Sequence, residues 1–372
     1  MKPYQFENLI LLMGTNPLPN YVIADYFLQE NQNISKIWLI YSKENNLQGG
    51  TLTYAENLEK IISHKWKKVH PSLEFPLEKV GLSDVSRAMT IQSEIKKSRL
   101  KEGAKEASFH LNYTGGTKSM STHIYWILRD FSKEEIIGNI SFSYLDARNF
   151  RLVSDDDNQI IENDLRKKIC LPFEDMIGLH GYQILTKKKN TEKFEKAAQI
   201  FKEYVDHNTT KERRNKIKQC EEGGKWLEVY IANKLEQKKL EHLTKEISTY
   251  VEIRQNISMK HPKWAGGRSN FEMDVMVVYG YQLTGISCTV QDVSMKCKQK
   301  GFEVILRSKQ IGGDESKSIL ITGSDKYQTE LLQQQLIVDT GGNTKNIKVF
   351  GLDDLRKEKY FFKELKRFIF TE

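Results

Sequence analysis

Residues 110–120 read HLNYTGGTKSM and join an apolar-rich run over 107–113 to a second run over 119–131. The first run predicts a buried strand, and the second predicts the helix that follows it. Between them, Gly115 and Gly116 let the backbone approach a ligand, and the free N–H groups of the helix start attract an anion. In a parallel α/β sheet such a loop binds phosphate, and an ordinary strand–helix turn is the alternative. The Gly-x4-Gly-Lys-Ser/Thr spacing of a Walker A loop is absent.

A second loop of this kind follows the first apolar run of the chain. Residues 8–13 (NLILLM) predict a strand buried on both faces, and Gly14-Thr15-Asn16-Pro17 comes directly after it. Strands and helices then alternate over about 150 residues, which predicts a doubly wound α/β domain. Ligands bind at the carboxyl ends of strands in such sheets, so both loops belong to one expected site. The lack of a GxGxxG motif argues against NAD and favours phosphate and ribose groups.

The composition indicates a globular protein of two domains. The chain has 372 residues, 39% of them hydrophobic, and a net charge of +8, which permits a polyanionic partner. Cys170, Cys220, Cys288 and Cys297 show no CxxC pair and no metal-ligand spacing, so we expect reduced thiols. No stretch approaches the roughly 18 apolar residues that span a bilayer, and the N-terminus does not look like a signal peptide. These features predict a cytoplasmic protein without a membrane partner.

The two loops resemble the signature loops of CARF domains, the Rossmann-like sensors of CRISPR-associated effectors. The match is closest to the Can2/Card1 type, in which a CARF domain is fused to a PD-(D/E)xK nuclease domain. The resemblance implies a homodimer of type III CRISPR antiviral defence that binds a cyclic oligoadenylate, cyclic tetra-adenylate (cA4) first, across its two-fold axis. The ligand-binding residues that it implies are Met13, Gly14, Thr15, Asn16, Pro17, Thr114, Gly115, Gly116, Thr117, Lys118 and Met120.

Three regions are expected along the chain: a CARF domain over residues 1–165, a basic and partly helical connecting segment over 166–219, and a second α/β domain over 220–372. The connecting segment carries more lysine and arginine than acid, which indicates a solvated face or a nucleic-acid contact. The second domain predicts a helix that opens at Gly223 and runs to about Lys234, strands over 251–257, 271–278 and 282–289, a helix over 302–310 and a strand over 318–322. This order resembles a restriction-endonuclease-like PD-(D/E)xK core.

Carboxylates in the second domain suit metal-dependent phosphodiester hydrolysis. Glu272 and Asp274 share a face of an apolar strand, where a carboxylate pair is costly unless it binds a cation or forms a salt bridge. Glu228, on the opening helix, resembles the helix glutamate of the fold, with a surface residue as the alternative. The resemblance implies that Glu228 and Asp274 bind Mn²⁺ or Mg²⁺, which activates the attacking water.

The next strand departs from the family pattern. Where Glu-x-Lys is expected, residues 285–290 read GISCTV, without acid or lysine. Either the lysine has moved to the following segment, with Lys298 the first candidate and Lys296 the second, or the site is degenerate. The first reading predicts a cA4-activated nuclease that cuts DNA, RNA or both, and the second predicts a ligand-gated nucleic-acid-binding regulator. A small-molecule α/β enzyme with a phosphate substrate is a third, weaker reading.

Overall fold

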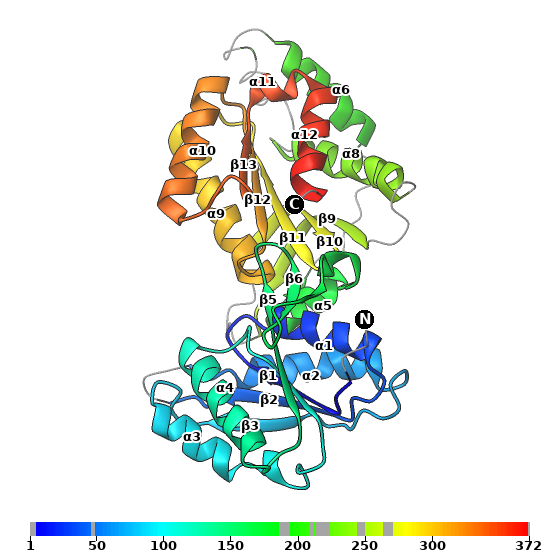
Figure 1. The fold of residues 1–372 in the computed structure, drawn as a ribbon. Coiled ribbons are helices and arrows are strands. Elements are labelled where there is room, and N and C mark those ends of the chain that lie inside the picture. Colours follow the sequence, from blue (N-terminus) through cyan, green and yellow to red (C-terminus); the bar gives the residue numbers. More distant parts are fainter. Residues whose placement is uncertain are drawn as a thin grey trace. The chain divides into compact units, whose positions relative to one another are not determined.

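The computed structural model describes residues 5–45, 49–185, 194–207, 212, 224–243, 250–262 and 271–370. The chain forms two compact units, Met1–Ile169 with Asp175–Gly181, and Cys170–Glu174 with Tyr182–Glu372. Each unit is built on its own sheet (Figure 1). The expected boundaries at 165 and 219 stay a prediction.

The first unit contains a seven-stranded sheet in the order β3-β2-β1-β4-β5-β6-β7. The first five strands in this order are parallel, and β6 and β7 continue the sheet in antiparallel fashion. All five residues of β1 are buried, as expected for a central strand covered on both faces. The strands are β1 (Asn8–Leu12), β2 (Lys36–Ser42), β3 (Glu78–Leu82), β4 (Phe109–Asn112), β5 (Ile140–Asp146), β6 (Arg151–Ser154) and β7 (Ile160–Glu162).

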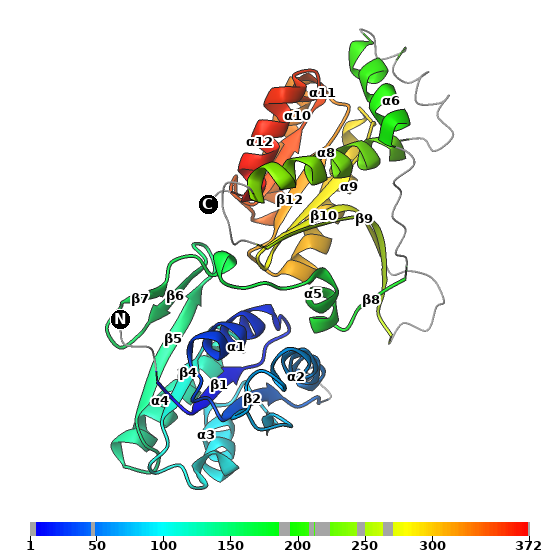
Figure 2. The same ribbon diagram turned by 90° about the vertical axis from the view of Figure 1, so that its right-hand side faces the viewer.

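Helices cover both faces of the first sheet. One core joins α3 and α4 to the inward side chains of β1, β2 and β4, and Figure 2 shows α1 and α2 side by side, as their mutual contacts require. The helices of this region are α1 (Leu18–Glu30), α2 (Leu52–Trp66), α3 (Ala88–Lys97), α4 (Lys118–Lys133) and α5 (Phe173–Leu179). Short 3₁₀ turns occur at Arg99–Lys101 and Leu165–Lys167.

The second unit contains a six-stranded mixed sheet in the order β13-β12-β11-β10-β9-β8. β8 to β11 are antiparallel neighbours, whereas β11, β12 and β13 run parallel to one another. The strands are β8 (Gln183–Ile184), β9 (Val251–Lys260), β10 (Phe271–Tyr279), β11 (Gln282–Cys288), β12 (Lys317–Ile321) and β13 (Ile347–Phe350).

Two helical layers enclose this second sheet. α6, α8 and α12 form a large core with β9, β10 and β11 on one face, and α9 and α10 pack on β12 and β13 on the other (Figure 1). The helices are α6 (Phe194–Asp206), α8 (Lys225–Leu243), α9 (Ser294–Gly312), α10 (Lys326–Thr340), α11 (Leu352–Leu355) and α12 (Glu358–Phe370). None of the described helices is long and apolar enough to cross a membrane.

Most expected elements are present, and the differences have physical causes. We expected Ser83-Asp84 to cap a helix, but α3 begins at Ala88, because Asp84 accepts hydrogen bonds from Ser86 instead. The sequence analysis did not predict β3, because its residues EKVGL lack the apolar run that marks a buried strand. It also missed α10, which has little amphipathic contrast and packs on β13 through Thr329, Leu332 and Leu336.

Candidate functional site

The two glycine loops of the first unit meet at one edge of its sheet. β1 and β4 are adjacent and parallel, with Leu11 paired to Asn112, so the residues that follow each strand emerge side by side. A Cβ added to Gly14 would lie 3.2 Å from the backbone nitrogen of Gly116. The loops are therefore in direct contact, as expected from the strand order.

Gly115 lies where the two loops are packed most tightly. A Cβ at this position would lie 2.0 Å from the Leu12 carbonyl oxygen and 2.7 Å from Asn20 Oδ1. Asn20 is fully buried and donates from Nδ2 to the Leu12 carbonyl at 2.9 Å. Gly116 has a φ of +74°, which an L side chain rarely adopts. Both glycines are thus required by the backbone itself.

Hydrogen bonds from polar side chains fix the conformation of the second loop at the start of α4. Thr117 caps the helix by accepting a hydrogen bond from the Met120 N–H at 3.2 Å. Asn112 Oδ1 accepts from the Thr114 N–H at 3.2 Å, and Thr114 Oγ1 accepts from the Leu145 N–H at 2.7 Å. The first turn of α4 carries no acid. Its dipole and terminal N–H groups therefore favour an anion beside Lys118.

The expected ligand residues divide into a supporting and an accessible group. Met13, Pro17, Gly115 and Met120 are buried and shape the loops from below. Asn16 is half-buried and accepts from the Leu18 N–H at 3.1 Å, which fixes the entry into α1. The accessible group comprises Gly14, Thr15, Thr114, Gly116, Thr117 and Lys118.

In the second unit, the pairing of β9 and β10 is irregular at Asp274. β10 pairs with β9 on both sides of Asp274, but Asn256, which would face Asp274, has a φ of +51°. Asparagine tolerates this left-handed conformation better than most residues. The backbone nitrogen of Cys288 and the hydroxyl of Ser287 donate to Asp274 Oδ2 at 2.8 Å and 2.9 Å. Asp274 is therefore fixed against the carboxyl end of β11.

Glu228 projects from the first turns of α8 toward this carboxylate. Burial, followed by the charge of Asp274, raises the pKa of Glu228 to about 8, with Lys300 and Lys225 opposing the shift. Burial and the charges of Asp274 and Glu228 likewise raise the pKa of the Cys288 thiol well above its ordinary value. Burial is the larger cause of both shifts, so the metal-free protein keeps Glu228 protonated up to about pH 8.

The other expected site residues differ in how strongly their charges act on this pair. Glu272 is exposed, and its charge has only a small effect on Glu228. Lys298 forms an ion pair with Asp339 at 2.8 Å, and Lys296 is exposed. Lys300, which the sequence interpretation did not select, is the lysine of α9 whose charge acts on both Glu228 and Cys288. No sequence signal favoured Lys300, because the expected helix begins at Phe302 and leaves this lysine outside it.

Two further expectations concern metal ligands and basic residues. Within the described residues, no group of three or more His, Cys, Asp or Glu side chains is arranged to hold a metal ion.

Lys196 and Lys202 of the connecting segment lie on α6. The other basic residues after Leu185 in that segment lie outside the described residues: Lys187, Lys188, Lys189, Lys193, Lys211, Arg213, Arg214, Lys216 and Lys218.

Comparison with known proteins identifies a family that the first unit resembles. Residues 9–166 match the family model of the Card1 CARF domain, which confirms the resemblance of the first unit. No curated protein matches the chain. Protein VC1899 from Vibrio cholerae is similar in structure over 97% of this chain and 98% of its own, with a TM-score of 0.66 and 11% identity.

Two other solved structures are similar. Can2 from Sulfobacillus thermosulfidooxidans, solved in complex with cA4, has a TM-score of 0.61 and 14% identity over 98% of this chain and 99% of its own. A type III CRISPR defence DNA nuclease activated by cyclic oligoadenylate has a TM-score of 0.53 and 15% identity over 86% of this chain and 46% of its own. At these identities the likeness shows a shared α/β fold.

Proposed function

We propose that the chain is a cyclic-oligoadenylate-activated, metal-dependent nuclease of type III CRISPR defence. The CARF match and the preformed loop edge around Gly115 and Thr117 support recognition of a cyclic oligoadenylate, and cA4 is the ring found in the similar Can2 structure. A ring with two-fold symmetry suits a homodimer that contributes the same loops from each subunit. Differential affinity for two arrangements of that dimer would make the ligand a switch.

The observation that carries the nuclease proposal is the position of Glu228, largely shielded from water beside Asp274, which raises its pKa to about 8. A buried glutamate whose pKa rises to about 8 beside a second carboxylate is costly in a purely structural role. Asp274 Oδ2 is held by two donors, and no described residue donates to Oδ1. One oxygen of Asp274 and the carboxylate of Glu228 are therefore open to a cation.

A divalent ion fits this pair in charge and donor type. Glu228 and Asp274 are oxygen donors of the kind Mn²⁺ and Mg²⁺ prefer, and water or substrate phosphate oxygens would complete the coordination. When bound, the ion would supply Lewis-acid stabilisation of charge on the phosphoryl group. The role of the protein is to hold Glu228 near Asp274, which Ser287 and Cys288 fix. Because its pKa is about 8, Glu228 would give up its proton when a cation binds.

The lysine of this site is proposed to be Lys300. Its positive charge favours the ionised form of Glu228, which is the form that binds a cation. Lys298 is engaged by Asp339. Lys300 is thus placed to act on charge near the carboxylates, in the role that the expected Glu-x-Lys lysine has in the family.

The alternative function is a cA4-gated nucleic-acid-binding regulator. Ser287 and Cys288 stand where the family acid is expected, and Asp274 already accepts two internal hydrogen bonds. Both features suit a site that has lost catalysis but kept its fold.

Cleavage assays separate the two functions. Single-stranded DNA, single-stranded RNA and supercoiled plasmid are incubated in Mn²⁺ with and without cA4, using the wild type and Asp274→Ala. Cutting that requires both cA4 and Asp274 is the expected result. Tight cA4 binding without any cutting would contradict the nuclease and leave the regulator.

A further inference from the structure

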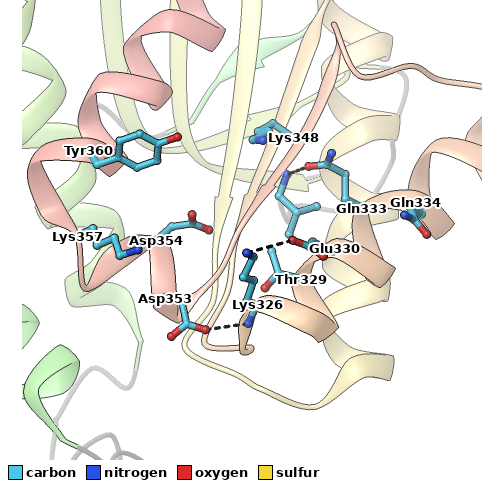
Figure 3. A pocket seen from close by; sticks show the side chains of 11 residues that line it. Lys326, Thr329, Glu330, Gln333, Gln334, Lys348, Asp353, Asp354, Lys357 and Tyr360 are labelled. Carbon is cyan, nitrogen blue, oxygen red and sulfur yellow. Dashed lines mark hydrogen bonds and ion pairs between the residues drawn. The ribbon is translucent and has the colours of Figure 1, made fainter.

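A polar pocket of about 600 Å³ lies along the outer edge of the second sheet (Figure 3). It is bounded by side chains of α10 on one side, of α11 and α12 on the other, and of the edge strand β13 between them. It contains none of the residues assigned above to metal or cA4 binding. The pocket is therefore a feature that the proposed function has not used.

The carboxylates of this pocket are occupied by the protein itself. Asp353 Oδ2 accepts a hydrogen bond from the Lys326 N–H at 2.9 Å, at the start of α10. Asp354 Oδ2 accepts from the Gly351 N–H at 2.9 Å, at the start of α11. A hydrogen-bonded carboxylate keeps its charge, so the ion pairs decide the balance: Asp353 also lies 3.5 Å from Arg356, and the third acid, Glu330, lies 3.9 Å from Lys326. Among the described residues, this leaves Asp354 as the one acid of the pocket without a basic partner.

The basic and aromatic groups, by contrast, are available. Lys348 and Lys357 have no carboxylate partner among the described residues, and Lys348 Nζ lies 5.5 Å from the centre of the Phe350 ring. Tyr360 is 55% exposed and presents its ring at the rim. Two ammonium groups and one accessible aromatic ring suit a phosphate with an adjoining base.

The edge strand β13 is poorly suited to pairing with an added peptide strand. Gln333 Oε1 accepts from the Val349 N–H at 2.9 Å, so a side chain already satisfies the donor that an added β-strand would need. The pocket chemistry thus favours an anion over β-strand addition.

Strand register places β13, the edge strand of this pocket, two strands from β11, whose end fixes Asp274. Cys288 of β11, Ile321 of β12 and Phe350 of β13 are paired in one row across the sheet. Cys288 donates to Asp274, and Phe350 is flanked by the pocket residues Lys348 and Val349. Two strand spacings separate the ends of this row, roughly 10 Å. A few nucleotides of an extended strand cover that distance.

We propose that the pocket at β13 is a secondary binding site for a single nucleic-acid strand, in which Lys348 and Lys357 contact phosphate and Tyr360 stacks on a base. The inference rests on the proposed function, because the strand is the substrate held at Glu228 and Asp274. The site would set the minimum substrate length and favour single strands, whose bases are free to stack.

Fluorescence anisotropy with 20-nucleotide single-stranded DNA and RNA tests the proposal, in EDTA so that no cleavage occurs. The double variant Lys348→Glu/Lys357→Glu should bind about tenfold more weakly and lower the log–log salt slope by about 1.4. Tyr360→Ala should bind about fivefold more weakly. The matched control Lys359→Glu, an exposed lysine of α12 outside the pocket, should stay within about twofold of wild type.

The remaining outcomes are decisive. Equal affinity of the double variant and Lys359→Glu would overturn the proposal, as would mononucleotide (AMP) binding that the double variant loses while 20-mer affinity is kept. A wild type that binds the 20-mer through this pocket but cuts nothing with Mn²⁺ and cA4 would refute the nuclease and not the pocket.

Discussion

The loop edge of the first unit and the carboxylate site of the second are built on opposite principles. Around Gly115 the backbone is packed so closely that no side chain fits, and the polar groups of Asn112, Thr114 and Thr117 have local partners. Around Glu228, burial and the neighbouring charge of Asp274 oppose ionisation of the carboxyl group. The first site is shaped by sterics and the second by electrostatics.

This difference indicates how each site should respond to change. A loop edge defined by close backbone contacts should fail when atoms are added, because the strands beneath it cannot move independently. A site in which burial opposes ionisation should become more stable when the ionisable carboxyl group is removed, at the cost of cation binding. Stability and function should therefore change together in the first unit and in opposite directions in the second.

Gly115→Ala should give the largest effect. The new Cβ would lie 2.0 Å from the Leu12 carbonyl oxygen, so the strand ends must separate. We expect a loss of about 3 kcal/mol in the free energy of unfolding and a loss of at least about 100-fold in cA4 affinity. Urea unfolding and calorimetric titration with cA4 measure the two quantities.

Gly49→Ala is the control, because nothing lies within 4 Å of its added Cβ. It should leave cA4 affinity unchanged. A Gly115→Ala protein with wild-type stability and cA4 affinity would contradict the claim that close backbone packing defines the ligand loops.

Lys300→Met should lower the cleavage rate about 100-fold, equivalent to about 2.7 kcal/mol in the activation barrier. Its charge assists the ionisation of Glu228, so its removal should also shift Mn²⁺ binding toward higher pH. Lys298→Met removes the ion pair with Asp339 and the contact with the Phe302 ring, and it should change the rate less than about threefold. The reverse order of the two variants would restore Lys298 as the active lysine.

Glu228→Gln should stabilise the metal-free protein at alkaline pH. A folded-state pKa near 8, raised from 4.5, means that the folded protein holds an extra proton between these values, so stability falls as pH rises through that range. Removing the titration should leave Glu228→Gln more stable by about 2 kcal/mol at pH 8.5, with little difference at pH 4.5.

Thermal unfolding across this pH range measures the effect, with the exposed Glu303→Gln as control. Mn²⁺ should stabilise the wild type at pH 8 but not Glu228→Gln, because only the former keeps both carboxylates. A flat pH dependence in the wild type would remove the electrostatic side of the comparison.

The loop edge was largely predictable from the sequence, because its determinants are local. Gly115, Gly116 and Thr117 follow a recognisable apolar strand, and the same signal at Gly14 placed the second loop beside it. The buried support of Asn20 was not predictable, since its partner Leu12 lies on another element and polar residues are rarely expected in a core.

The carboxylate site was predictable only in part. Asp274 stood out as an acid within an apolar strand, and Glu228 came from the family resemblance. The choice among Lys296, Lys298 and Lys300 was beyond sequence reasoning, because α9 begins at Ser294, eight residues before the helix expected at Phe302. Without the helical register, no spacing rule could show which lysine faces the carboxylates.

The smallest expected effect comes from comparing two helix N-caps. We expect Thr117 to contact the ligand as well as cap its helix, whereas Asp325 only caps its helix. Thr117→Ala and Asp325→Ala each remove the acceptor of one helix N–H, from Met120 and Gln328 respectively. Each should cost about 1 kcal/mol of stability. Only Thr117 lies at the loop edge, where a ligand phosphate would meet the same helix start, so only Thr117→Ala should weaken cA4 binding, by about fivefold. Equal cA4 affinities in the two variants would show that the start of α4 serves the fold alone and would move the anion contact to Lys118 and the Gly14 loop.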